Sequence, residues 1–443
     1  MNNAGVYVGL DIGTTAIKVV IAQVSGTQLN IIGSGHVPSR GMRRGVIVDI
    51  DETAAAIRQA IEQAQEKANV QITDVVVGIP ANQLEILPVQ GLVSVANQNK
   101  RITYDDVQNV AQQALSHSLP AEREIIDLVP EEFIVDGFDG IKDPHEMIGV
   151  RLEMRGTAYV GPTAIVANIR TAVQKAGLVV QQFVLTPLAL ANAILSEGER
   201  DFGTVIVDLG GGQTSVAVAH DHQLKFVYVD PEGGDNVTRD ISSVLGMSYD
   251  NAEQVKRDYG YAEPSQTSEY DEFTYEGING QTAKSNEEYL ANIIAARLEQ
   301  IFGKIKERLT LISALDMPGG FVLTGGNAAL PRTKQLAQDY FGENVRLFIP
   351  EHIGLRHPAY TRAIAYAAYV SRQTMTQQVV KRALLQETQT TNFDYEAAGY
   401  VPNQQVEQTA YPEAQYEQTQ TNDRFFGKIG QRLRDLFTDE TNE

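Results

Sequence analysis

Two copies of one short pattern, in opposite halves of the chain, constrain the fold more than any other feature. Val6–Val20 reads VYVGLDIGTTAIKVV, and Thr204–Val218 reads TVIVDLGGGQTSVAV. Each copy has an apolar β-branched run, an Asp-x-Gly turn and a second apolar run, which predicts a strand, a tight turn and a returning strand. Helical patterns at 51–69 and 286–309 and strand patterns at 75–79 and 321–324 follow the copies. The repeat therefore predicts two related α/β halves.

Composition limits the function classes. The 443 residues are enough for more than one domain of roughly 100–200 residues each. The absence of cysteine excludes disulfides and thiolate zinc sites. A net charge of -20 repels polyanions, so nucleic acid is not an expected partner. The N-terminus lacks a signal-peptide pattern and no apolar run is long enough for a membrane span, so the expected location is the cytoplasm.

The first repeat carries a candidate phosphate site. Asp11 ends the predicted strand, Gly13, Thr14 and Thr15 form the turn, and Lys18 follows it. Backbone N–H groups and hydroxyls in such a turn can point at an anion, and the lysine adds positive charge. The alternative for this turn alone is an ordinary glycine hairpin.

The second repeat has the same character and more glycine. Its candidate phosphate-binding residues are Asp208, Gly210, Gly211, Gly212, Gln213 and Thr214. Three consecutive glycines allow the backbone to approach phosphate oxygens closely. One carboxylate per turn, from Asp11 and Asp208, is suited to hold a hydrated Mg²⁺ between two phosphate sites, because this ion keeps several waters and takes few protein ligands. An ordinary hairpin is again the alternative.

A third glycine turn strengthens the prediction of a nucleotide site. The apolar strand 321–324 runs into Gly325, Gly326 and Asn327, where the chain can turn beneath a purine ring. The sequence contains neither a Walker motif nor a G-x-G-x-x-G after a strand. A bound nucleotide would therefore be held in another way.

Together these motifs resemble those of the actin, DnaK-type chaperone and sugar-kinase superfamily. DIGTT at 11–15, DLGGGQT at 208–214 and TGGNAALP at 324–331 are similar to its first phosphate, second phosphate and adenosine motifs. The resemblance implies an α/β, two-lobed fold of duplicated RNase H-like domains with ATP and Mg²⁺ between the lobes. Glu253 and Lys256 match an A-E-x-x-K pattern that contacts ribose and adenine there. Gly233 and Gly234 complete the set of candidate cofactor-binding residues.

Two further segments narrow the resemblance within this superfamily: SRGMRRGVIVDID at 39–51 and GIKDPHEMIGVRLEM at 140–154. With them, the chain resembles most closely the FtsA family of bacterial cell-division proteins. This resemblance implies the following units: a first-lobe core (1A) at 1–82 and 162–195, an inserted subdomain (1C) at 83–161, a second-lobe core (2A) at 196–230 and 307–382, and an outer subdomain (2B) at 231–306.

One departure from the hydrolytic relatives concerns catalysis. In those relatives a carboxylate just before a proline helps to position the attacking water, whereas this chain has Thr186 before Pro187. A threonine cannot act as that base. We therefore expect weak or no ATPase activity.

The C-terminal region changes composition sharply. Residues 383–423 contain no Lys or Arg and few aliphatic residues, which is typical of a disordered linker. Residues 424–437 then have the pattern of an amphipathic helix. Its apolar residues share about one third of the helix circumference, and Lys428 and Arg432 flank them. The apolar set is Phe425, Phe426, Ile429, Leu433, Leu436 and Phe437.

This segment is predicted to lie on a membrane surface. Fourteen helical residues reach only about 21 Å, which is less than the roughly 30 Å of a bilayer's hydrocarbon core. Docking on the protein itself or on a partner is the alternative. The resemblance to the family's membrane-targeting sequence favours the membrane, with anionic inner-membrane lipids as the partner.

The function implied by the resemblance is a self-associating, ATP-binding protein that tethers FtsZ filaments to the cytoplasmic face of the membrane at the division site. The C-terminal peptide of FtsZ would dock on the outer subdomain, with Arg297 as a basic contact, and the alternative for Arg297 is a solvated side chain. Two other functions stay open. A sugar-type kinase would need a carboxylate base, and an MreB-like scaffold would usually lack the insertion.

Overall fold

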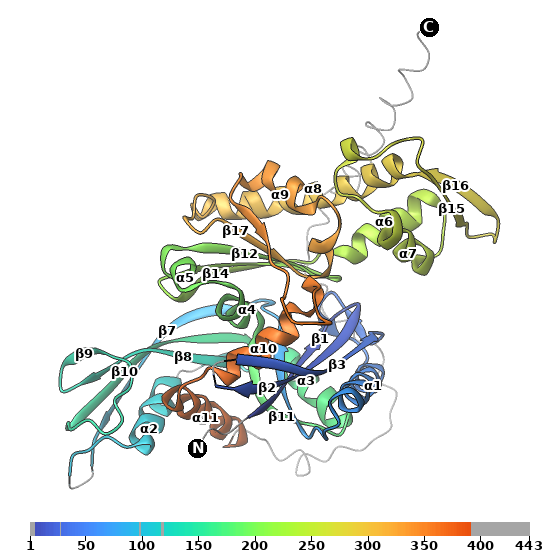
Figure 1. The fold of residues 1–443 in the computed structure, drawn as a ribbon. Helices are drawn as coiled ribbons and strands as arrows, with labels where there is room; N and C mark the ends of the chain where they lie inside the picture. Colours follow the sequence, from blue (N-terminus) through green and yellow to red (C-terminus); the bar gives the residue numbers. More distant parts are fainter. Residues whose placement is uncertain (1–4, 27, 97–98, 117–118, 391–443) are drawn as a thin grey trace.

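The computed structural model describes residues 5–26, 28–96, 99–116 and 119–390. Figure 1 shows two lobes stacked one above the other, each built around a five-stranded sheet. A smaller subdomain projects from each lobe, on opposite sides of the molecule (Figure 1).

The first lobe is built on the sheet β11-β6-β1-β2-β3. Its strands are β1 (Val6–Ile12), β2 (Ala16–Ser25), β3 (Gln28–Pro38), β6 (Asp74–Ile79) and β11 (Val179–Leu185). Strands β1, β2 and β3 are antiparallel, whereas β6 runs parallel to β1 and β11 runs parallel to β6. Helices α1 (Ile50–Ala68) and α3 (Thr163–Lys175) pack their apolar residues on this sheet and form one core with it. The short strands β4 (Met42–Arg43) and β5 (Val46–Ile47) pair between β3 and α1.

The second lobe repeats this arrangement with the order β14-β13-β12-β17-β18. Its strands are β12 (Thr204–Leu209), β13 (Thr214–His220), β14 (Gln223–Asp230), β17 (Phe321–Thr324) and β18 (Val345–Leu347). Three antiparallel strands are again followed by two parallel ones. The prediction of two related α/β halves is confirmed. Helices α5 (Glu197–Phe202), α8 (Glu287–Leu311) and α9 (Thr333–Phe341) pack on this lobe.

Local signals in the sequence set many of these bounds. Helix α1 starts where the carboxylate of Asp49 accepts a hydrogen bond from the Glu52 N–H at 3.0 Å. It ends at Asn69, whose φ of 52° is left-handed. The predicted helix at 51–69 therefore differs from α1 by one residue at each end, and the strand predicted at 321–324 coincides with β17.

The inserted subdomain has its own sheet, in the order β7-β10-β8-β9. Its elements are β7 (Glu85–Ser94), α2 (Tyr104–Leu115), β8 (Arg123–Val135), β9 (Phe138–Ile141) and β10 (Arg151–Pro162). Helix α2 packs on one face of this sheet and forms a separate apolar core with it. These elements span residues 85–162, beside the predicted bounds of 83–161, and the division of the chain into subdomains stays a prediction.

The outer subdomain of the second lobe is mainly helical. It contains α6 (Gly234–Leu245), α7 (Tyr249–Tyr259), the 3₁₀ turn η1 (Pro264–Gln266) and the hairpin of β15 (Glu272–Glu276) and β16 (Thr282–Asn286). The long helix α8 packs against α6, and its C-terminal part continues along the second-lobe core. The two other 3₁₀ turns are η2 (Gly326–Ala329) and η3 (Pro358–Tyr360).

Two helices differ from the predicted second-lobe range, which extends to residue 382. Helix α10 (Thr361–Ser371) packs on β1 and on α4 (Thr186–Ile194), and Figure 1 shows it entering the lower lobe. Helix α11 (Met375–Thr390) packs on α2 and β8 of the inserted subdomain. The chain thus returns from the second lobe to the first. The apolar residues of α10 and α11 are buried there, against the first lobe and its inserted subdomain.

The start of the predicted linker also needs correction. Helix α11 includes residues 383–390, which the composition assigns to a disordered segment. Ala383 is fully buried with Val379 and Val380 in the core of the inserted subdomain. Helical spacing of these small apolar residues outweighs the polar composition around them. The rest of the predicted linker and the amphipathic segment 424–437 lie outside the described residues.

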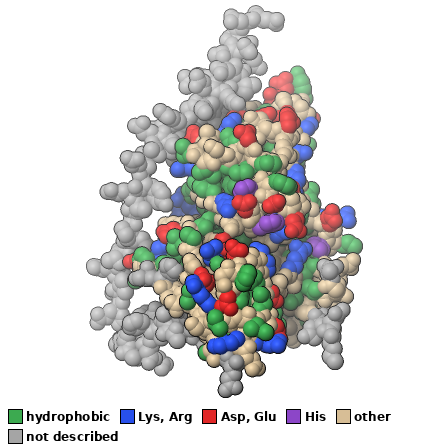
Figure 2. All heavy atoms as spheres, turned by 90° about the vertical axis from the view of Figure 1, so that its left-hand side faces the viewer, with side chains coloured by type: hydrophobic (Ala, Val, Ile, Leu, Met, Phe, Trp, Pro, Cys, Tyr) green, Lys and Arg blue, Asp and Glu red, His purple; other side chains and the backbone are tan. Residues whose placement is uncertain are grey.

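The surface is mixed in charge on the face that Figure 2 presents, where acidic, basic and apolar side chains are interspersed. The excess negative charge is therefore not gathered into one field on this face. Within the described part of the chain, no helix has the length and apolar character that a bilayer crossing requires.

Candidate functional site

The two predicted phosphate turns lie at equivalent ends of the two sheets. The strand register pairs Asp11 with Lys18 in the first hairpin and Asp208 with Ser215 in the second. A cavity of about 700 Å³ lies between the lobes, and both turns line it, together with the third turn after β17 and residues of α7. The duplicated fold therefore brings the two copies of the sequence pattern to opposite sides of one cavity.

The two turns approach each other so closely that glycine is required in the second. A Cβ atom on Gly212 would lie 2.4 Å from Thr14 Oγ1, and one on Gly211 would lie 2.6 Å from the Thr15 methyl group. Thr14 Oγ1 also accepts a hydrogen bond from the Gly45 N–H at 3.0 Å. Side chains from the first lobe thus fill the space that a larger residue would need.

The third turn is tied to the second. Asn327 Nδ2 donates to the Gly210 carbonyl at 2.7 Å. Gly325 has a φ of +90°, and a Cβ atom there would lie 2.5 Å from Asp208 Oδ1. The predicted adenosine turn and the predicted phosphate turn are therefore one connected structure.

Glu253 and Lys256 form an ion pair on α7 beside the same cavity, with 2.6 Å between Nζ and Oε2. Lys256 Nζ also donates to Thr238 Oγ1 at 2.7 Å and to the Gly234 carbonyl at 3.2 Å. Burial opposes the charge on Glu253, but the neighbouring lysine outweighs this and lowers the pKa of the carboxyl. The carboxylate of Glu253 is thus charged, and its partner Lys256 is buried.

Most of the predicted cofactor-binding residues line the cavity, but Thr214 and Gly233 do not. Thr214 is buried, and its hydroxyl donates to the Glu232 carbonyl at 2.9 Å. Gly233 packs against the second turn, since a Cβ atom there would lie 2.4 Å from the Gly211 carbonyl oxygen. These two residues support the turn rather than line the cavity.

The sequence-based prediction missed several residues that line the cavity. They are His36, Arg257, His357, Tyr360, Arg362 and Tyr366. His36 and Tyr360 meet edge to face, with ring centroids 6.0 Å apart, although they come from distant parts of the chain. The available signal for Arg362 was a single arginine in the otherwise apolar helical run TRAIAYAAYV.

Arg362 lies between the two carboxylates that were expected to hold magnesium. Its Nε donates to Asp208 Oδ2 at 2.6 Å, and its Nη1 is 4.0 Å from Asp11 Oδ1. The other oxygen of Asp11 is 3.6 Å from Lys18 Nζ. Burial disfavours the charge on Arg362, but the carboxylates outweigh this and raise the pKa of its guanidinium.

This arrangement does not fit a hydrated Mg²⁺ between the two carboxylates. Asp208 Oδ2 already accepts the hydrogen bond from Arg362. Asp208 Oδ1 is buried against the Gly325 turn, and among the described residues it has no hydrogen-bond partner. A hydrated metal needs a carboxylate oxygen open to its water shell. The predicted metal role of Asp11 and Asp208 therefore conflicts with the position of the arginine.

Thr186 lies in the wall of the cavity with its hydroxyl already engaged. Its Oγ1 donates to the Ile79 carbonyl at 2.9 Å and lies 2.9 Å from the Tyr366 hydroxyl. Burial raises the pKa of Tyr366 far above its usual range. At neutral pH neither hydroxyl is a base for activating water.

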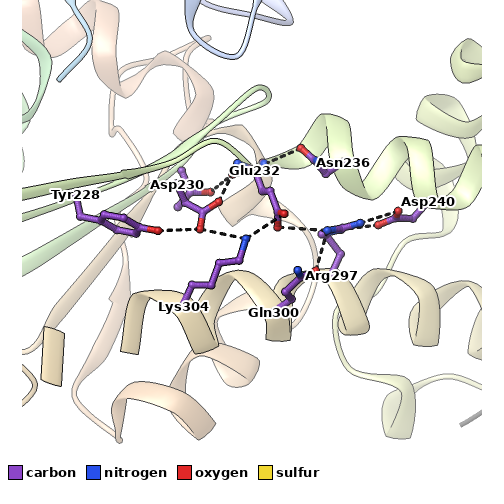
Figure 3. Close-up of polar contacts among 10 residues, drawn as sticks. Tyr228, Asp230, Glu232, Asn236, Asp240, Arg297, Gln300 and Lys304 are labelled. Atoms are coloured by element: carbon purple, nitrogen blue, oxygen red, sulfur yellow. Dashed lines mark hydrogen bonds and ion pairs between the residues drawn. The ribbon is translucent and has the colours of Figure 1, made fainter. Parts of the chain in front are cut away.

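Arg297 is buried, and its guanidinium points toward Asp240 and Glu232 (Figure 3). It is 6% exposed and binds both oxygens of Asp240, and its Nη1 also lies 3.3 Å from Glu232 Oε2. The alternative of a solvated arginine is wrong for this reason. Its role as a partner contact stays a prediction.

The ion-pair network around Arg297 connects to the second phosphate turn through Glu232. Lys304 Nζ lies 3.0 Å from Glu232 Oε1 and 3.5 Å from Asp230 Oδ2 (Figure 3). The Glu232 backbone carbonyl accepts the hydrogen bond from Thr214 behind the second phosphate turn. One residue therefore connects the turn to the long helix α8.

Comparison with known proteins identifies the family. The sequence pattern of the family described as cell division protein FtsA matches residues 205–365, and that of the SHS2 domain inserted in FtsA matches 81–160. The cell division protein FtsA of Enterococcus hirae is 52% identical over 88% of both chains. That of Enterococcus faecalis is 46% identical over 99% of both chains, and that of Escherichia coli is 30% identical over 82% of this chain and 89% of its own.

Solved structures support the fold. A PilM–PilN type IV pilus biogenesis complex aligns with a TM-score of 0.58 at 17% identity, covering 83% of this chain and 99% of that one. MreB5 of Spiroplasma citri bound to ADP aligns with a TM-score of 0.50 at 12% identity, covering 84% and 98%. The two-lobed actin-like fold with its inserted subdomain is confirmed, and the chain belongs to the FtsA family of cell-division proteins.

Proposed function

We propose that this protein binds ATP in the cavity between its lobes. Both phosphate turns, the adenosine turn and the pair Glu253 and Lys256 border one cavity of about 700 Å³, which is large enough for a small-molecule ligand. Lys18, Lys256, Arg257 and Arg362 also border it and supply positive charge for phosphates. The MreB5 neighbour was solved with ADP, which is consistent with a nucleotide in this fold.

We further propose that the protein self-associates and holds FtsZ filaments at the cytoplasmic face of the membrane, at the division site. Membership in the FtsA family supports this role. The C-terminal segment 424–437 supplies the membrane contact in this proposal, on the strength of its amphipathic sequence pattern. The outer subdomain, which includes Arg297, is the proposed docking region for the C-terminal peptide of FtsZ.

In this proposal the protein does not catalyse efficient phosphoryl transfer. A sugar-type kinase or a fast ATPase requires a group that accepts a proton near the reacting phosphate. Thr186 stands where a carboxylate would be needed, and its hydroxyl donates to a backbone carbonyl. ATP is instead proposed to act as a ligand that favours the closed arrangement of the lobes.

The observation that carries the proposal is the single cavity shared by all three glycine turns. Equilibrium titration of the full chain with a fluorescent ATP analogue tests the nucleotide site. Flotation of anionic vesicles with the full chain, and with a chain ending at Thr421, tests the membrane role, with and without ATP and FtsZ. The full chain should carry FtsZ to the vesicle fraction, and the shortened chain should not. Absence of ATP binding would contradict the proposed nucleotide site. Recruitment of FtsZ to vesicles by the shortened chain would contradict the proposed membrane role of the C-terminal segment.

A further inference from the structure

We propose that Arg362 takes the place of a divalent cation, as the charge that lets a nucleotide's phosphates approach Asp11 and Asp208. The inference rests on the proposed nucleotide site and goes beyond it. The positive charge that binds the phosphates then comes from the chain itself. Nucleotide binding should therefore depend little on Mg²⁺.

The fold delivers Arg362 to this position from a distant part of the sequence. Helix α10 packs on β1 and α4, so its first turn lies beside the end of β1 and opposite the end of β12. Arg362 is the second residue of this helix. Its guanidinium contacts Asp208 of the second lobe at 2.6 Å and lies 4.0 Å from Asp11 of the first. One cation therefore bridges a carboxylate from each lobe.

The charges of this cluster are already balanced. Asp11 and Asp208 carry two negative charges, and Lys18 and Arg362 carry two positive ones. The side chains of the two aspartates and the lysine are at most 10% exposed, and that of Arg362 is 19% exposed. A Mg²⁺ between the carboxylates would have to displace the guanidinium or lie against it, leaving excess positive charge in a nearly buried cluster.

Arg362 is also close enough to the second phosphate turn to meet a phosphate. A Cβ atom on Gly210 would lie only 3.0 Å from Arg362 Nη2, so the guanidinium lies directly against this turn. Within the described part of the chain, the hydrogen bond of Arg362 to Asp208 uses Nε. Nη1 lies 4.0 Å from Asp11 Oδ1, which is beyond hydrogen-bond distance, so both terminal nitrogens can still donate to phosphate oxygens in the fork geometry that arginine offers.

Titration of the full chain with a fluorescent ATP analogue, in buffer with Mg²⁺ and in buffer with EDTA, tests this inference. The dissociation constant of the wild-type protein should differ by less than about threefold between the two buffers. Arg362→Gln should raise it by at least about tenfold in EDTA. Mg²⁺ should recover part of that loss, because the two carboxylates are then free to hold a metal. Arg356→Gln is the matched control, since Arg356 is exposed and comes from the same segment.

Two results would overturn the inference: a wild-type protein that loses at least about tenfold of its affinity in EDTA, or an Arg362→Gln variant that binds as tightly as wild type in EDTA. Thermal unfolding monitors the fold of the variant. If Arg362→Gln does not fold, the wild-type comparison alone decides. Binding in Mg²⁺ but not in EDTA overturns only this inference, whereas binding in neither buffer overturns the proposed nucleotide site and this inference with it.

Discussion

The guanidinium of Arg297 on α8 and the carboxylate of Asp240 on α6 form a two-point ion pair, with Nε–Oδ2 and Nη2–Oδ1 distances of 2.6 and 2.9 Å. Both side chains are 8% exposed. Burial disfavours the charge on each, and the hydrogen bonds to Asp240 outweigh this for Arg297 and raise its pKa. The pair therefore holds two helices of the outer subdomain together and is sensitive to the loss of either member.

Charge reversal at Arg297 should destabilise the outer subdomain. Arg297→Glu places a third carboxylate beside Asp240 and Glu232, and loss of one partner of a buried pair costs about 3–5 kcal/mol. Urea denaturation measures this change in the free energy of unfolding. Arg239→Glu, an exposed reversal on α6, is the control and should stay within about 0.5 kcal/mol of wild type.

The same variant bears on the proposed FtsZ contact. Arg297→Glu should weaken capture of the FtsZ C-terminal peptide without changing ATP binding. Asp240→Asn distinguishes the two roles of Arg297, because it weakens the ion pair and leaves the arginine charged. Equal loss of capture in both variants would assign Arg297 a supporting role, and unchanged capture by Arg297→Glu would remove it from the docking site.

A bulky residue at position 326 should block nucleotide binding while the fold stays intact. Among the described residues, a Cβ atom on Gly326 has only the Ala359 methyl group nearby, at 3.7 Å, so Gly326→Ala should bind a fluorescent ATP analogue normally. Gly326→Glu adds length and negative charge to the cavity wall and should lower the affinity by at least about tenfold. Circular dichroism checks the fold. Equal affinity of the Glu variant and the parent would exclude this turn from the site.

ATP turnover should be very slow. Thr186 offers no carboxylate and donates its proton to the Ile79 carbonyl, so nothing at that position activates water. A steady-state phosphate-release assay should give a rate far below the typical enzyme value of about 10 s⁻¹. A rate near that value, abolished by Asp208→Ala, would contradict the prediction.

Membrane binding should depend on the apolar stripe of the segment 424–437. Phe426→Glu or Leu433→Glu should release the protein from anionic vesicles, because each places a charge in that stripe. Gln431→Glu is the matched control, since on a helix it lies about 240° from Phe425, on the polar side. Flotation assays measure the bound fraction.

Binding should also increase with protein concentration, because linked segments on one assembly gain effective concentration. High salt should weaken attachment only in part, since the apolar contacts are not screened. Equal release by Gln431→Glu and Leu433→Glu would contradict the assignment of the stripe.

Local features of the sequence were sufficient to predict the two halves and most of the cavity. A strand, a glycine turn and a returning strand are encoded within fifteen residues, so Asp11 and Asp208 were placed correctly at the strand ends. The three glycine turns and the pair Glu253 and Lys256 also border this one cavity, and their contact with a nucleotide stays a prediction. Composition was less reliable near residue 383, where tertiary packing made a helix from a polar segment.

The sequence by itself determined the duplicated strand–turn–strand units, because hydrophobic alternation and glycine act over a few residues. Only the tertiary structure decided which charges meet. Arg362 and Asp208 are 154 residues apart, and Arg297 and Asp240 are 57 apart, yet both pairs form contacts of 2.6 Å. Such pairings depend on where whole helices pack, and no local pattern records which aspartate a given arginine will reach. For that reason the sequence could not predict that Arg362 pairs with Asp208 beside the expected metal site, or that Arg297 is buried against Asp240 and not solvated.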